Sequence, residues 1–129
     1  MSTPLHVIQE HYAASAKGDL VGMLAPLSAH VRWTEMAGFP YAGTYVGPDA
    51  VRDNVFHRIN TDWVDFRAAP EHFVSAGQEV VAFGTYSGTY RASGKSMVAR
   101  FVHHWTFDDG VVVRFEQYAD THRVVSALA

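Results

Sequence analysis

From Trp63 to Asp120 the sequence keeps a period of two, and this feature most limits the folds open to the chain. Apolar and polar residues alternate over four stretches, at about 63–75, 79–90, 96–107 and 112–120. Short turn signals separate the stretches, namely Gly77-Gln78, Ser93-Gly94 and Asp109-Gly110. Such alternation is typical of half-buried strands, and glycine-containing pairs between strands are typical of hairpins. The second half of the chain is therefore predicted to be an antiparallel meander.

The first half of the chain changes to the spacing of helices. A first helix is expected over about 4–17, because Thr3 can cap it and proline suits its first position. Asp19 is expected to cap a short second helix, a strand follows at about 30–36, and Gly47-Pro48 opens a third helix. Helices followed by a meander predict an α+β fold with the helices on one face of the sheet.

Composition limits the class of protein. The 129 residues include no cysteine, carry a formal net charge of −3 and are 48% hydrophobic, which predicts a single folded domain over 1–129 and excludes disorder. The acidic balance argues against a nucleic-acid partner, which would need a basic face. No apolar run reaches the roughly 18 residues of a membrane span, and no signal peptide opens the chain. We therefore expect no membrane association and a cytoplasmic protein.

The Asp109-Gly110 turn offers a way to predict which side chains share a face. If these two residues form a two-residue turn, pairing proceeds outward from Asp108 and Val111. The opposed pairs are then Trp105–Arg114, His103–Glu116, Phe101–Tyr118 and Ala99–Asp120. Asp120 would face the interior beside His103. A three-residue turn with a bulge would shift the register by one residue and reverse the orientation of Asp120, and this alternative stays open.

The favoured register produces a face that mixes large aromatic residues with ionisable groups. One reading is an apolar pocket with a few convergent titratable groups, the usual form of a small-molecule site. The other reading is that the polar groups satisfy one another or lie at a wet dimer interface. On the opposite face, Val98, Val102 and Phe115 would stay uncovered by the helices. Because a large apolar patch rarely stays exposed on a monomer, we expect a homodimer.

Glu35 is a second candidate for chemistry. Strand alternation groups it with Val31 and Trp33, so its carboxyl is expected to point inward. Burial against aromatic rings would raise its pKa, which suits a general base. The alternative is a simple buried pair with Arg100 or Arg114.

The eight histidines do not indicate a metal site. The sequence contains no HExxH motif, and the neighbours His103 and His104 must point to opposite faces of a strand. His6 and His11 are five residues apart, a poor spacing for one helix face. We expect neither a metal nor an organic cofactor.

Five local motifs stand out along the chain: Tyr12 through Gly18-Asp19-Leu20, Val31 to Glu35, Gly43 to Pro48, His103 to Gly110 and Phe115 to Asp120. Together with the predicted order of helices and strands, these motifs resemble the SnoaL-like, ketosteroid isomerase-like branch of the nuclear transport factor 2-like superfamily. The resemblance covers nearly the whole chain. It implies a cone-shaped, curved mixed or antiparallel sheet, wrapped by three N-terminal helices and followed by a short C-terminal helix. A pocket inside the cone would take a small hydrophobic molecule.

The resemblance also implies site residues. Asp120 matches the aspartate that the cyclase and epoxide hydrolase branches use near the end of the last strand. Glu35 is offset by about two residues from the position of the isomerase's carboxylate base. His103 occupies the position where the isomerase has a protonated aspartate. The tyrosine donor of the isomerase aligns near His11 or Tyr12. No match to the epoxide hydrolase Arg/Asp pair is found in 80–89.

The predicted function follows from these residues. Asp120, Glu35 and His103 are the candidate catalytic residues. The candidate substrate-binding residues are His11, Tyr12, Trp33, Phe56, Trp63, Phe101, Trp105 and Tyr118. Together they suit an isomerase, polyketide cyclase or dehydratase that acts on a hydrophobic, carbonyl-bearing molecule by acid–base catalysis. The alternative is a non-catalytic ligand-binding or dimeric accessory domain, so the sequence leaves open whether the chain is an enzyme.

Overall fold

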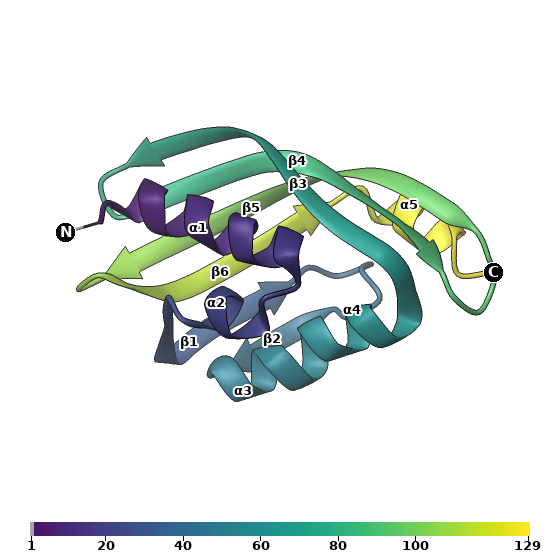
Figure 1. Ribbon diagram of the computed structural model, residues 1–129, viewed down its shortest axis with the longest axis horizontal. Coiled ribbons are helices and arrows are strands. Elements are labelled where there is room, and N and C mark those ends of the chain that lie inside the picture. The colour runs from purple at the N-terminus through teal and green to yellow at the C-terminus, as the bar shows by residue number, and fades with distance from the viewer. Residues whose placement is uncertain (1) are drawn as a thin grey trace.

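A curved, six-stranded mixed sheet organises the fold, and the computed structural model describes residues 2–129 (Figure 1). The strand order is β2-β1-β6-β5-β4-β3, with β1 and β6 parallel and the other neighbours antiparallel. The strands are β1 (Leu27–Glu35), β2 (Gly43–Val46), β3 (Trp63–Ala76), β4 (Glu79–Tyr90), β5 (Ser96–Asp108) and β6 (Val111–Ala119). The sheet stays open, and the predicted α+β class with its meander is confirmed.

The helices before the meander lie on one side of this sheet (Figure 1). They are α1 (Pro4–Lys17), α2 (Leu20–Leu24), α3 (Pro48–Val51), the π-helical turn η1 (Arg52–Phe56) and α4 (His57–Asp62). The last three run on without a break and form the predicted third helix. The Thr3 hydroxyl accepts a hydrogen bond from the His6 amide at 3.2 Å, as expected for the cap of α1. The short C-terminal helix α5 (Thr121–Ser126) packs against β5.

The Asp109-Gly110 turn has two residues, as predicted, with positive φ angles of 50° and 81°. Asp108 pairs with Val111. The register then shifts, because Phe107 pairs with Val112 whereas Thr106 pairs with Arg114. Val113 is therefore an extra residue in β6, a β-bulge. The observed pairs beyond it are Trp105–Phe115, His103–Gln117, Val102–Tyr118 and Phe101–Ala119.

This bulge makes the predicted strand pairs wrong and reverses the faces of β6. One extra residue moves every later side chain to the other side of the sheet. Phe115 and Gln117 are buried, whereas Tyr118 is 44% exposed on the outer face. Asp120 does not face the interior, and its prediction as an inward residue is wrong. It instead caps α5, where its Oδ1 accepts a hydrogen bond from the Arg123 amide at 3.3 Å.

Aromatic residues form much of the core on the inner face. Trp33 stacks on Phe115 with ring centroids 3.7 Å apart, and Trp105 contacts both rings edge to face. These contacts tie β1, β6 and β5 together beneath the helices. Within residues 2–129, no helix is both long enough and apolar enough to cross a membrane.

Candidate functional site

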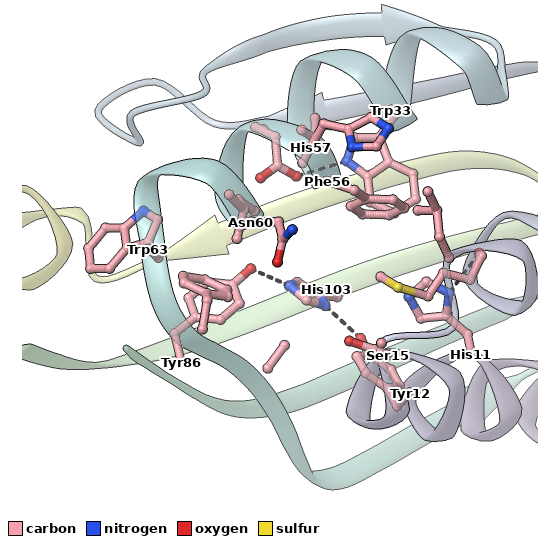
Figure 2. A pocket seen from close by; sticks show the side chains of 18 of the residues that line it. His11, Tyr12, Ser15, Trp33, Phe56, His57, Asn60, Trp63, Tyr86 and His103 are labelled. Carbon is pink, nitrogen blue, oxygen red and sulfur yellow. Dashed lines mark hydrogen bonds between the residues drawn. The ribbon is translucent and has the colours of Figure 1, made fainter. Parts of the chain in front are cut away.

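A cavity of about 470 Å³ lies between the inner face of the sheet and the helices (Figure 2). Eight of the residues predicted for the site line it: His11, Tyr12, Trp33, Glu35, Phe56, Trp63, His103 and Trp105. Phe101 is buried beneath it and stacks on His103 at 4.1 Å. Tyr118 and Asp120 lie outside the cavity, because the β-bulge at Val113 turns the later side chains of this segment to the other face. The sequence therefore located most of the wall but misplaced one of three catalytic candidates.

Glu35 is the buried acid of this cavity. It is the last residue of β1 and is 4% exposed. Burial raises the pKa of its carboxyl to about 8, and the Trp33 indole N–H, which donates to Oε2 at 2.9 Å, opposes this rise. The alternative of an arginine pair is wrong, because Arg100 pairs with Glu71 at 2.5 Å and Arg114 lies 3.7 Å from Glu116. Glu35 is thus a protonated group at neutral pH that can lose its proton near pH 8.

His103 lies between two tyrosines. Its Nδ1 is 2.5 Å from the Tyr12 hydroxyl and its Nε2 is 2.5 Å from the Tyr86 hydroxyl (Figure 2). The Trp105 indole N–H donates to the Tyr12 hydroxyl at 3.2 Å. Burial holds the pKa of His103 well below its usual range, so the ring is neutral. Because both ring nitrogens bond tyrosine hydroxyls, His103 has no free ring nitrogen to offer to the cavity.

His11 adds an acceptor at the α1 side of the cavity. Its Nδ1 lies 3.0 Å from the Met23 carbonyl oxygen, which can only accept, so Nδ1 carries a proton. Burial lowers the pKa of His11 to about 4, and the hydrogen bond to Met23 opposes this. The neutral ring therefore presents Nε2 as a lone-pair acceptor.

Sequence reasoning missed two functional candidates, Tyr86 and Gln117. Tyr86 lines the cavity from β4 and is 4% exposed. The alternation of β4 could have found it, since Val80, Ala82 and Tyr86 share its buried phase. Gln117 is fully buried, and its Oε1 accepts from the Met36 amide at 3.2 Å. Finding Gln117 would have required knowledge of the bulge.

The Gln117 amide nitrogen has no hydrogen-bond partner anywhere in residues 2–129. It lies close enough to Tyr86 to lower the pKa of that hydroxyl, although burial, the largest effect, and the Glu35 charge raise the pKa well above its usual range. We regard the amide as a neighbour of Tyr86 without a formed hydrogen bond. Buried N–H groups without partners are rare and costly.

Asp120 is expected to affect stability and not the cavity. Replacing it by Ala removes the α5 cap and the contact at 3.5 Å to the Arg123 guanidinium. Loss of a cap costs about 1 kcal/mol. Urea denaturation should show this loss, while ligand binding and any turnover should stay at the wild-type level. A large fall in turnover in a well-folded Asp120→Ala protein would contradict this placement.

Of the other histidines, His57 on α4 also lines the cavity, whereas His6 and His104 form pairs with acidic residues away from it. His6 pairs with Glu10 at 2.8 Å and His104 with Glu79 at 2.6 Å. Across the described part of the chain, no three histidine, cysteine or acidic side chains are grouped so that they could hold a metal ion.

Comparison with known proteins identifies a domain family and several similar solved structures. The SnoaL-like domain model matches residues 8–115. An NTF2-like protein from Burkholderia thailandensis E264 is 43% identical over 100% of this chain and 99% of its own, with a TM-score of 0.97. One from Burkholderia pseudomallei K96243 is 34% identical over 100% and 99%, with a TM-score of 0.90. TerC, co-crystallized with polyporic acid, is 29% identical over 98% of each chain, with a TM-score of 0.86. No protein with a curated description matches.

Proposed function

The chain belongs to the SnoaL-like domain family, and we propose that it is a small-molecule enzyme of the isomerase, cyclase or dehydratase type. Its substrate would be a hydrophobic molecule that carries a carbonyl group. The observation that carries the proposal is Glu35, a carboxyl with a pKa of about 8 that faces an aromatic cavity. A general acid or base works best when its pKa lies near the operating pH.

The proposed chemistry uses groups of the chain itself. Ionised Glu35 takes a proton from a carbon next to the substrate carbonyl, and the enolate oxygen accepts a hydrogen bond from a neutral donor in the cavity. The same carboxyl then returns the proton at another carbon. The two tyrosine hydroxyls beside His103 are donors of the required kind. Their high pKa keeps both protonated.

The walls support a flat, apolar substrate. Aromatic rings from β1, η1, β3 and β6 line the cavity: Trp33, Phe56, Trp63, Phe66 and Phe115. Its volume of about 470 Å³ is in the range of small-molecule sites, which run from about 300 to 1,000 Å³. The similarity to TerC, which was crystallized with polyporic acid, supports the same class of ligand and makes polyporic acid a suitable first probe.

Proton exchange distinguishes an enzyme from a binding domain. A panel of cyclic and aromatic ketones in D₂O, followed by ¹H NMR, should reveal a ketone whose protons next to the carbonyl exchange faster with the protein than without it. A non-catalytic domain would bind such compounds and leave their exchange rates unchanged. That result across the panel would contradict the proposal.

We also propose that the chain forms a homodimer through the outer face of the sheet. Val98 on β5 is 59% exposed and Tyr118 on β6 is 44% exposed, on the side that the helices leave open. Phe115, expected on this face, is buried on the other side, so the patch is smaller than predicted.

Light scattering should give the mass of a dimer at micromolar concentration. Val98→Glu should produce monomers, because a charge on each copy would be buried at the interface. Val21→Glu is the matched control, since Val21 is 80% exposed on α2, on the helical side. A monomeric wild type, or a dimer that survives Val98→Glu, would contradict this interface.

A further inference from the structure

The row Tyr12–His103–Tyr86 contains one more proton than its hydrogen bonds can use. Each tyrosine brings one hydroxyl proton and the neutral histidine brings one N–H. Two hydrogen bonds, both 2.5 Å long, join the three groups. One of these bonds uses the histidine N–H, and the other uses a tyrosine proton. One hydroxyl proton is therefore left over inside a buried cavity, and the tautomer of His103 decides which tyrosine holds it.

The neighbours of the two tyrosines favour one arrangement. Tyr12 already accepts the Trp105 indole N–H at 3.2 Å. If His103 carries its proton on Nε2, Tyr12 accepts from Trp105 and donates to Nδ1, so its hydroxyl is satisfied in both directions. If the proton were on Nδ1, Tyr12 would have to accept from both rings and its own proton would have no acceptor in the row. The Nε2–H form therefore leaves the spare proton on Tyr86.

The surroundings of Tyr86 do not consume this proton. The unpaired amide nitrogen of Gln117 lies beside the hydroxyl, and an amide N–H can only donate. In the described residues, no hydrogen bond is formed in which Glu35 accepts from Tyr86, although the two groups are close enough for the Glu35 charge to act on the hydroxyl. Tyr86 is thus a cavity-lining donor beside the candidate base.

We propose that the Tyr86 hydroxyl holds the substrate oxygen, and that His103 is a positioning residue that frees this hydroxyl by carrying its proton on Nε2. The proposal rests on the proposed function, since it names the donor for the carbonyl or enolate oxygen of that substrate. It predicts a ligand whose oxygen lies at Tyr86, so that the carbon next to the carbonyl lies toward Glu35. Tyr12 supports His103 and is not the primary donor.

The first test needs no ligand. ¹⁵N NMR of histidine-labelled protein, above the lowered pKa of His103, should show Nε2 protonated and Nδ1 as the acceptor. Tyr12→Phe should keep this tautomer, because Tyr86 still accepts from Nε2–H. Tyr86→Phe should leave the Nε2 proton without an acceptor and shift the ¹⁵N signal of Nε2, because Tyr12 still accepts from Trp105 and donates to Nδ1. A wild-type ring protonated on Nδ1 would overturn the assignment, whatever the protein does with substrates.

The second test uses the same pair of variants, each of which loses one hydroxyl. Any ketone from the exchange panel that the wild type binds, or polyporic acid, is titrated against both. A lost hydrogen bond to the ligand oxygen raises Kd by about tenfold. Tyr86→Phe should show this loss and Tyr12→Phe a smaller one. The reverse order, with both proteins folded, would overturn the assignment of Tyr86 and leave the acid–base role of Glu35 standing.

Discussion

Replacing Glu35 by Gln is expected to remove turnover and, at the same time, to stabilise the folded protein at neutral pH. The amide keeps the shape of the carboxyl and can still accept from the Trp33 indole N–H, which bonds Oε2 at 2.9 Å. It cannot take up a proton, and loss of a general base lowers the rate by about 10²- to 10⁴-fold. In the wild type, turnover should rise with pH toward 8 as the base ionises, and the variant should lack this rise.

The gain in stability follows from the direction of the pKa shift. The pKa of Glu35 is about 8 in the folded protein and about 4.5 for an ordinary glutamate. Below pH 4.5 both states hold the proton. Between these values the unfolded chain releases it and the folded protein keeps it, so stability falls as pH rises and stays lower above 8. At roughly 1.4 kcal/mol per pH unit, the cost reaches several kcal/mol.

Urea denaturation at pH 5 and pH 8 measures this effect. His11 and His103 act in the opposite direction, because their lowered pKa values make stability fall as pH drops below about 6.5. The two histidines contribute equally to Glu35→Gln and to the wild type, so their effect cancels when the free energies of unfolding are subtracted. The remaining difference should grow from pH 5 to pH 8. Glu116→Gln, on the outer face, is the control. It should leave the exchange of the ketone protons unchanged, and its difference from the wild type in free energy of unfolding should not grow from pH 5 to pH 8. Full activity in Glu35→Gln would contradict acid–base catalysis by this residue.

The contrast between Glu35 and Asp120 shows what the sequence could predict. Alternation of Val31, Trp33 and Glu35 sets the phase of β1, because the first two side chains are large and apolar. In β6, the residues Val111, Val112 and Val113 are all apolar, so the pattern has no phase there. The turn was predicted correctly, but the extra residue lies three positions after it, where no side chain marks a bulge. The side chains of β6 from 114 onward were therefore assigned to the wrong face.

The polar groups of the cavity were harder to predict than its walls. Large aromatic side chains in strands are buried because they remove a large apolar surface from water. The burial of Trp33, Trp63 and Trp105 could therefore be predicted from each residue alone. A buried hydroxyl or amide depends on a partner from another strand. Tyr86 and His103 meet because β4 and β5 pair in one register, and Gln117 reaches them through the bulge. Such pairs are a property of the register and are not visible in any one segment.

Gly84→Ala is expected to produce the largest loss of stability among conservative changes at the site. Gly84 lies on β4 between Pro70 of β3 and Phe101 of β5. An added Cβ would lie 2.3 Å from the Ala69 carbonyl oxygen and 2.5 Å from the Phe101 ring. The carbonyl belongs to the backbone of β3 and cannot turn away, so the strands must separate. Overpacking of this kind costs about 3 kcal/mol.

The same change should disturb the cavity, because the Phe101 ring supports the hydrogen-bonded row. Its centroid lies 4.1 Å from that of His103 and 4.5 Å from that of Tyr86. Gly88→Ala is the matched control: it lies four residues later on β4, and its Cβ would come no closer than 3.2 Å to the Phe66 backbone. Urea denaturation should show a clearly larger loss for Gly84→Ala, and the ¹⁵N signals of His103 should shift in that variant. Equal, small losses in both proteins would mean that β3 and Phe101 can yield at this point, and that the row is held by its hydrogen bonds without the support of the packing beneath it.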